Sequence, residues 1–202
     1  MIDIDFMFIF FFAVIDPIGT IPVYIAVTKH FNEYKKRKIA IKATLVAAGV
    51  LVFFVIAGEV ILTAIDIPLA AFQVAGGIVL FLFALSMIFG ESKPEEELHN
   101  ISNENETAIF PLAIPSIASP GAMLGAVLMT KNETHTFFEQ FQTTLVMLSV
   151  LLIVLIFLLL ATRIQRIIGD SGASIISRVM GLILSSVAID NILEGIKIYF
   201  AL

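Results

Sequence analysis

The sequence of 202 residues contains no cysteine and few charged residues, and both absences limit what the protein can be. Without cysteine there are no disulfides, no thiolate metal sites and no thiol nucleophiles. Charged residues make up only 14% of the chain, whereas hydrophobic residues make up 59%. Such a chain has too few polar residues to cover the surface of a water-soluble globular protein. We therefore expect an integral membrane protein.

Motifs of intramembrane catalysis are absent as well. The sequence has no His-Glu-x-x-His and no Gly-x-Gly-Asp, and His30, His99 and His135 all fall in predicted links. We therefore expect no catalytic residue, no metal site and no cofactor. The net charge of −5 comes largely from one acidic loop, so it does not indicate a nucleic-acid partner.

Six apolar stretches are long enough to cross a membrane as helices. Barrel strands would alternate apolar and polar residues in segments of about ten, which these stretches do not do. The predicted fold is an all-α membrane protein with six transmembrane helices. Their predicted ranges are Phe6–Thr28, Ile39–Ile65, Leu69–Phe89, Ala108–Met129, Thr144–Ala161 and Ile175–Phe200.

The distribution of Lys and Arg predicts the orientation. The link between the first two spans is rich in lysine, from Lys29 to Lys42, and the positive-inside rule places it in the cytoplasm. Arg163 and Arg166 mark the link before the last span as cytoplasmic. Both termini of a six-span protein then lie outside, and we expect the plasma membrane. The acidic segment 91–107 is interpreted as a cytoplasmic linker.

The first span contains the sequence Asp16-Pro17-Ile18-Gly19-Thr20-Ile21-Pro22. Proline removes a backbone donor and clashes with the preceding turn, and glycine adds freedom, so this stretch should interrupt the helix. Asp16 lies ten residues after Phe6, about 15 Å along a helix and near the membrane midplane. Unwound backbone at that depth is tolerated only where protein or a water-filled cavity covers it.

The fourth span repeats this interruption. It reads Pro111-Leu112-Ala113-Ile114-Pro115-Ser116-Ile117-Ala118-Ser119-Pro120-Gly121, so that Pro17 and Gly19 correspond to Pro120 and Gly121. Other weak matches follow in the same order. We therefore expect two three-helix repeats, 1–90 and 108–202, separated by the linker 91–107. With three spans each they would be inverted relative to one another, an arrangement typical of transporters.

Paired breaks in two inverted halves are the best sequence indication of a substrate site. A half-helix that begins after a break presents free N–H groups, which suit a carboxylate, and the preceding half-helix presents carbonyls, which suit a cation. An α-amino acid carries both charges. The candidate substrate-binding residues are Asp16, Pro17, Gly19, Thr20, Ser116, Ser119 and Gly121. Ordinary proline kinks satisfied by neighbouring Ser and Thr are the alternative.

The polar residues of the spans have more than one interpretation. Asp16 could bind a substrate ammonium group, take up a coupling proton, or cap the half-helix after Pro17. Thr20, Ser116 and Ser119 could bind ligand or satisfy the backbone. Asp190 and Glu194 share a helix face, where like charges would repel unless one is protonated or a cation lies between them. Together with Asp16 they are the candidates for coupling a proton or sodium.

Glycine-rich faces, such as Gly76-Gly77 and Gly181, favour close helix packing and are compatible with a homo-oligomer. Lipid is the other partner that the composition requires. A passive channel or an exporter of another small solute would also need broken helices, and an intramembrane enzyme is a weaker alternative. Paired breaks at the midplane suit alternating access better.

These motifs in combination resemble the MarC family, also described as a neutral amino acid transporter family. The resemblance covers nearly the whole chain and includes the Asp16–Pro22 stretch, Gly76-Gly77, the Pro111–Pro115 stretch with Ser119-Pro120-Gly121-Ala122, and Arg178-Val179-Met180-Gly181. It implies six spans in two inverted repeats. It also implies movement of small neutral amino acids such as glycine, alanine or serine.

Overall fold

The structure is a computed structural model that describes residues 4–89, 104–132 and 135–201. All regular elements in this part of the chain are helical, with no strand. In order they are α1 (Ile4–Ile15), α2 (Thr20–Thr28), α3 (Glu33–Ala64), α4 (Leu69–Phe89), α5 (Glu104–Thr107), the π-helical η2 (Ala108–Ile117), α6 (Pro120–Leu128), α7 (Phe137–Leu159) and α8 (Ala161–Tyr199).

Five segments are long and apolar enough to cross a membrane: Ile4–Thr28, Glu33–Ala64, Leu69–Phe89, Phe137–Leu159 and Ser171–Tyr199. The bent pair of Glu104–Ile117 and Pro120–Leu128, whose axes meet at 59°, makes a sixth if the pair is counted as one broken span. The predicted all-α membrane fold is confirmed.

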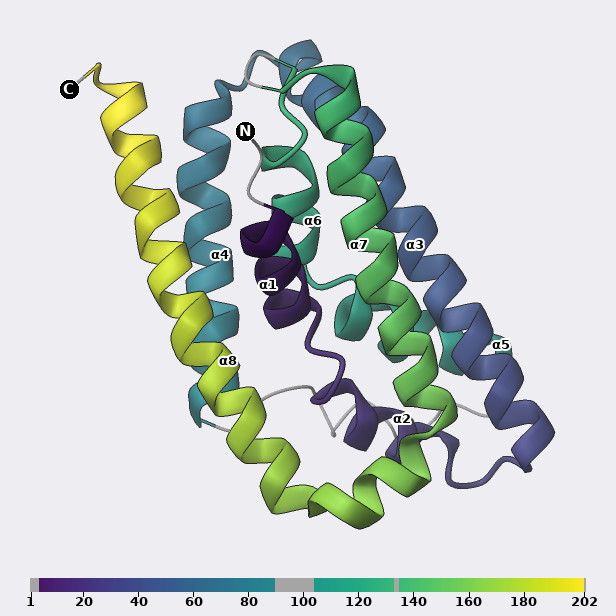
Figure 1. The fold of residues 1–202 in the computed structure, drawn as a ribbon. Helices are drawn as coiled ribbons and strands as arrows, with labels where there is room; N and C mark the ends of the chain where they lie inside the picture. The colour runs from purple at the N-terminus through teal and green to yellow at the C-terminus, as the bar shows by residue number, and fades with distance from the viewer. Residues whose placement is uncertain (1–3, 90–103, 133–134, 202) are drawn as a thin grey trace.

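The two interrupted segments lie in the middle of the bundle. Figure 1 shows α1 and α6 between α4 and α8 on one side and α3 and α7 on the other, with α2 toward the lower end. The start of α1 and the end of α8 lie at the same end. The core is built around these central segments and includes Phe11, Ile15, Leu112 and Ile117, all buried. The breaks are therefore enclosed by other helices rather than exposed to lipid.

Helices α4 and α8 pack closely in antiparallel fashion through small residues. A Cβ atom at Gly77 would lie 3.1 Å from the Ala188 carbonyl oxygen, and one at Gly181 would lie 2.9 Å from the Ala84 carbonyl oxygen. Glycine here lets the two backbones approach, as is common where membrane helices associate. Gly77 and Gly181 thus serve packing within the chain, and a homo-oligomer stays a prediction.

Helices α3, α7 and α8 begin at least six residues before the predicted spans. Asn32 caps α3 by accepting a hydrogen bond from the Lys35 N–H at 2.9 Å, so the helix includes the lysine-rich stretch. A capping box between Thr136 and Glu139 starts α7. Arg163 and Arg166 of the predicted link lie within a helix, because the candidate span Ser171–Tyr199 is preceded by the first turns of α8, which begins at Ala161. Its interruption lies at Gly169, whose φ of +68° suits glycine.

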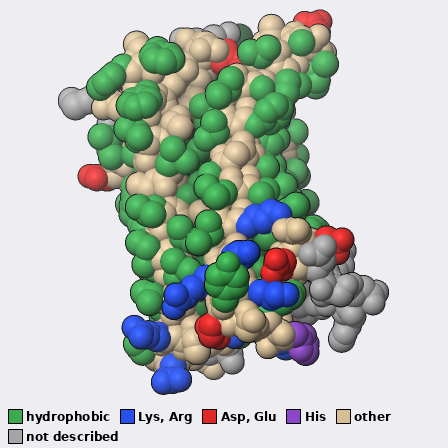
Figure 2. Space-filling view, turned by 90° about the vertical axis from the view of Figure 1, so that its right-hand side faces the viewer, with side chains coloured by type: hydrophobic (Ala, Val, Ile, Leu, Met, Phe, Trp, Pro, Cys, Tyr) green, Lys and Arg blue, Asp and Glu red, His purple; other side chains and the backbone are tan. Residues whose placement is uncertain are grey.

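Basic side chains gather at one end of the bundle, which we call the basic end. On the face in Figure 2 the Lys and Arg side chains lie toward this end, whereas hydrophobic side chains cover much of the rest. The other end, where α1 begins and α8 ends, is called the opposite end. Of the predicted acidic linker, residues 91–103 lie outside the described residues. Its last four residues form α5, where Glu104 pairs with Lys35 of α3 at 3.8 Å.

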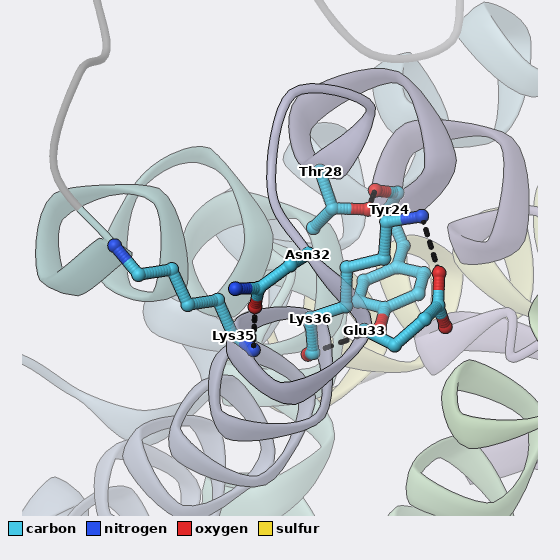
Figure 3. A network of polar contacts seen from close by, with 6 residues as sticks. All are labelled: Tyr24, Thr28, Asn32, Glu33, Lys35 and Lys36. Carbon is cyan, nitrogen blue, oxygen red and sulfur yellow. Dashed lines mark hydrogen bonds and ion pairs between the residues drawn. The ribbon is translucent and has the colours of Figure 1, made fainter.

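A polar network at the basic end fastens the half-helix α2 to α3 (Figure 3). The Tyr24 hydroxyl donates to the Lys36 carbonyl at 3.0 Å, and the Thr28 hydroxyl donates to the Tyr24 carbonyl at 2.6 Å. Lys36 also pairs with Glu33 at 2.8 Å. The far end of α2 is thereby held in place, which positions its N-terminus at the first break.

Candidate functional site

The first break lies between α1 and α2 and is organised by Asp16. This residue has a φ of +49°, a conformation that Asp tolerates better than most residues, and its side chain is 3% exposed. Its Oδ1 accepts a hydrogen bond from the Gly19 N–H at 2.9 Å, and its carbonyl accepts one from the Thr20 hydroxyl at 2.9 Å. The carboxylate therefore satisfies a free amide where α2 starts, one of the roles that the sequence left open.

The second oxygen of Asp16 is bound by the last helix. Ser177 of α8 is buried and donates a hydrogen bond to Asp16 Oδ2 at 3.0 Å. A Cβ atom at Gly19 would lie 2.6 Å from Ser177 Oγ and would also clash with Asp16 Oδ2. Glycine at position 19 is thus required by the close approach of both side chains.

The second break has the same design with a different cap. Helix η2 has non-helical backbone at Phe110 and Ile114 and ends before Ser119. Ser119 Oγ accepts a hydrogen bond from the Ala122 N–H at 3.2 Å, and Pro120 occupies the first turn of α6, where its missing N–H costs nothing. Ser119 therefore caps α6, and Asp16 makes the corresponding contact in the turn just before α2, since each side chain accepts a hydrogen bond from the amide three residues later.

The two breaks are in direct contact. The Ser119 hydroxyl donates a hydrogen bond of 3.0 Å to the carbonyl of Val14, in the last turn of α1. A Cβ atom at Gly121 would lie 2.5 Å from Val14 Cγ2 and from Leu80 Cδ1, so α1, α4 and α6 meet closely here. Because Val14 and Ser119 are fully buried, the interrupted spans share one enclosed polar centre.

The remaining candidate hydroxyls differ in how they are satisfied. Thr20 is fully buried and donates to the Asp16 carbonyl, so it serves the backbone of the break. Ser116, in η2, is 2% exposed, and its Oγ has no hydrogen-bond partner among the described residues. A buried hydroxyl without a partner costs about 1–3 kcal/mol. Ser116 is therefore the candidate residue with unused hydrogen-bonding capacity.

Asp190 and Glu194 do not lie at the breaks. They line an open cavity of about 550 Å³ at the opposite end, between α1, α4, α6 and α8. Its other lining residues are Phe6, Phe10, Gln73, Leu124, Gly125, Leu128, Met129, Lys131, His135, Ser186, Val187 and Asn191. Asp16 thus lies at the breaks, whereas Asp190 and Glu194 lie in this cavity. We call it the outer cavity because it lies at the opposite end from the basic end.

Sequence reasoning did not identify Ser177, Gln73 or Lys131. Ser177 is one of several serines in α8, and only the fold reveals that it faces Asp16. Gln73 could have been found from the sequence, because a polar amide within an apolar span usually makes a polar contact inside the protein. No group of three or more His, Cys, Asp or Glu side chains able to hold a metal ion occurs in the described ranges.

Taken together, the fold and the joined breaks define an integral multi-pass membrane protein with two interrupted spans. Residues 3–200 match the family described as MarC family integral membrane protein, and the chain belongs to this family. It is 33% identical over 189 residues to a UPF0056 membrane protein of Methanocaldococcus jannaschii, covering 92% of each chain.

Two bacterial relatives show similar coverage. A UPF0056 membrane protein of Buchnera aphidicola subsp. Baizongia pistaciae is 30% identical over 187 residues, or 93% of this chain and 92% of the relative. The UPF0056 inner membrane protein YhgN of Escherichia coli is 30% identical over 189 residues, or 92% of each chain. No solved structure matches.

Proposed function

We propose that the protein is a non-enzymatic secondary transporter of small neutral amino acids of the glycine, alanine and serine class. One observation carries the proposal: two helices interrupted in different halves of the chain meet directly, through the hydrogen bond from Ser119 to Val14. A chance proline kink in each half would not require the two kinks to touch. Broken helices that meet inside a bundle are the usual form of a transporter substrate site.

The chemistry at the breaks suits a zwitterion. The N-termini of α2 and α6 present backbone amides and positive dipole ends, which favour a carboxylate. The buried carboxylate of Asp16 and the carbonyls at the end of α1 favour an ammonium group. The Ser116 hydroxyl can give or accept a further hydrogen bond. These groups would bind the carboxylate and the ammonium group of an amino acid.

Alternating access would come from movement between two inverted halves, 1–90 and 108–202. The helix contacts support this division. Segments α1 and α2 pack against α7, η2 and α6 pack against α3, and the third helices α4 and α8 pack against each other. Each interrupted span thus packs against the second helix of the other half, as expected for two inverted repeats.

For orientation we propose that the basic end faces the cytoplasm and the opposite end faces outward, in the plasma membrane. The lysine-rich start of α3 supports this through the positive-inside rule. A proton or sodium is the proposed coupling ion, with Asp16 as its candidate at the breaks.

The proposal is tested by counterflow in proteoliposomes. Vesicles loaded with unlabelled glycine, alanine or serine should accumulate labelled amino acid transiently, because an alternating-access carrier exchanges solutes. Asp16→Asn should slow this at least about tenfold, because the loss of a charged partner is worth roughly 1.4 kcal/mol or more. Asp66→Asn, in the turn between α3 and α4, is the matched control and should behave as wild type.

Other outcomes would point to other functions. Labelled solute that enters at the same rate with empty and loaded vesicles indicates a channel. Counterflow of none of the three amino acids contradicts the proposal and directs the search to another small solute. Replacement of sodium by potassium, and an imposed pH gradient, identify the coupling ion.

A further inference from the structure

The outer cavity contains an arrangement of charges that the breaks do not explain. It reaches inward to Phe10 and Gly125, whose contact is so close that a Cβ atom on Gly125 would clash with the Phe10 ring. Phe10 precedes Asp16 by six residues, about 9 Å along a helix. The cavity is therefore separated from the first break by a layer of packed side chains, and its polar residues require a reason of their own.

Gln73, in the wall of this cavity, is hydrogen-bonded to two residues of opposite charge. This side chain is 3% exposed. Its Oε1 accepts a hydrogen bond from Lys131 Nζ at 3.2 Å, and its Nε2 donates to Glu194 Oε2 at 3.3 Å and to Asn191 Oδ1 at 3.4 Å. The Gln73 amide thus lies between the ammonium of Lys131 and the carboxylate of Glu194. Lys131 follows α6 and Glu194 lies in α8, and both line the same cavity.

This arrangement of an ammonium on one side and a carboxylate on the other suits the two charges of an α-amino acid. The Gln73 amide offers Lys131 a carbonyl oxygen, as a substrate carboxylate would, and offers Glu194 an N–H donor, as a substrate ammonium would. Groups that complement both ends of an amide therefore also complement both ends of a compact zwitterion. Asp190 adds a second carboxylate on the side of Glu194.

We propose that the outer cavity is a second binding site for a zwitterionic small solute, with its carboxylate toward Lys131 and its ammonium toward Asp190 and Glu194. The proposal rests on the proposed function, because the solute would bind in the outer cavity before it reaches the site at the breaks. Gln73 is its positioning residue, because its amide is hydrogen-bonded to both Lys131 and Glu194. The Phe10–Gly125 contact closes the path below the site.

The chemistry of the cavity favours this occupant over an ion alone. The described residues offer no group of three ligating side chains for a metal. An inorganic anion would face the carboxylates of Asp190 and Glu194, and like charges repel. A zwitterion satisfies both signs at once.

Because the chain has no cysteine, the site can be tested by labelling single-cysteine variants. Ser186→Cys places a thiol in the cavity wall, and Thr63→Cys, exposed at the end of α3, is the control outside it. We expect a membrane-impermeant maleimide added outside proteoliposomes of known orientation to label both. Saturating glycine or alanine should slow labelling of Ser186→Cys several-fold and leave that of Thr63→Cys unchanged.

Uptake kinetics provide the second test. Glu194→Gln and Lys131→Gln should each raise the KM for alanine about tenfold, the loss of one charge-assisted hydrogen bond, with a smaller effect on the maximal rate. Lys197→Gln, exposed in the last turn of α8, should leave both constants unchanged. Failure of Ser186→Cys to label from outside, labelling without protection, or an unchanged KM would each overturn the second site. If counterflow persists in those cases, the proposed function stands; if wild type transports no amino acid, both fall.

Discussion

Ser177 in α8 donates a hydrogen bond of 3.0 Å to Oδ2 of Asp16, which lies 161 positions earlier in the chain at the first break. Both side chains are buried, so the last helix of the protein directly stabilises the interruption of the first span. Any movement of α8 relative to α1 must stretch or break this contact. The bond therefore couples the position of α8 to the shape of the candidate site.

Replacement of Ser177 by alanine should destabilise the protein. The change removes a hydrogen bond to a buried carboxylate and should lower the free energy of unfolding by about 1.5–3 kcal/mol. Ser174→Ala, on the exposed face one turn earlier, is the control and should stay within about 0.5 kcal/mol of wild type. Denaturant titration in mixed micelles measures both. Equal stability of the two variants would show that the Ser177–Asp16 contact contributes nothing.

The contact between the breaks is tested by Gly121→Ala. The added methyl group would meet Val14 and Leu80 at 2.5 Å and push α6 away from α1, which should cost about 1–3 kcal/mol. Gly49→Ala provides the comparison, because no atom beyond its own helix lies within 4 Å of a Cβ there. In the middle of α3 that change should be neutral or stabilise by up to about 1 kcal/mol. Thermal unfolding of the two variants in the same detergent distinguishes the cases.

The anchor of α2 at the basic end is tested by Tyr24→Phe. The variant keeps the ring and loses only the hydroxyl that donates to the Lys36 carbonyl, so stability should fall by about 1 kcal/mol. Tyr34→Phe is the matched control. Tyr34 is 68% exposed and contacts Lys38 through its ring, which phenylalanine keeps. An equal loss in both variants, measured by unfolding, would contradict the anchoring role.

Orientation in the membrane follows from single-cysteine labelling of intact cells. Thr63→Cys, at the opposite end, should react with an impermeant maleimide added outside, and Tyr34→Cys, at the basic end, should react only after the membrane is permeabilised. The expectation comes from the lysine-rich start of α3. The reverse pattern would place the basic end outside the cell.

Local chemistry made the elements and the breaks predictable. Proline, glycine and a carboxylate within a few residues indicate an interrupted helix from sequence alone, and the structure interrupts both spans at those residues. The errors at the starts of α3 and α7 arose because the capping residues Asn32 and Thr136 were overlooked. Thr136 and Glu139 form a capping box that would have started α7 at Phe137.

The contacts between distant residues were not predictable in the same way. Nothing in the sequence around Ser177 distinguishes it from other serines of α8, such as Ser185, whose hydroxyl is bonded to its own helix. The placement of Asp190 and Glu194 in an outer cavity likewise depends on how α8 crosses α4. These relationships come from packing, which a pattern along one helix does not encode.

The most direct measurement is calorimetric titration of glycine, alanine and serine into the purified wild-type protein and its Ser116→Ala variant. Ser116 has no hydrogen-bond partner among the described residues, so its removal should leave stability unchanged or raise it slightly. Ser149→Ala, exposed on α7 and bonded within its helix, is the control. We predict that wild type and Ser149→Ala bind alike and that Ser116→Ala binds about fivefold to tenfold more weakly, the effect of one lost hydrogen bond. Equal affinity in all three proteins, or no binding by wild type, would contradict a substrate site at the joined breaks.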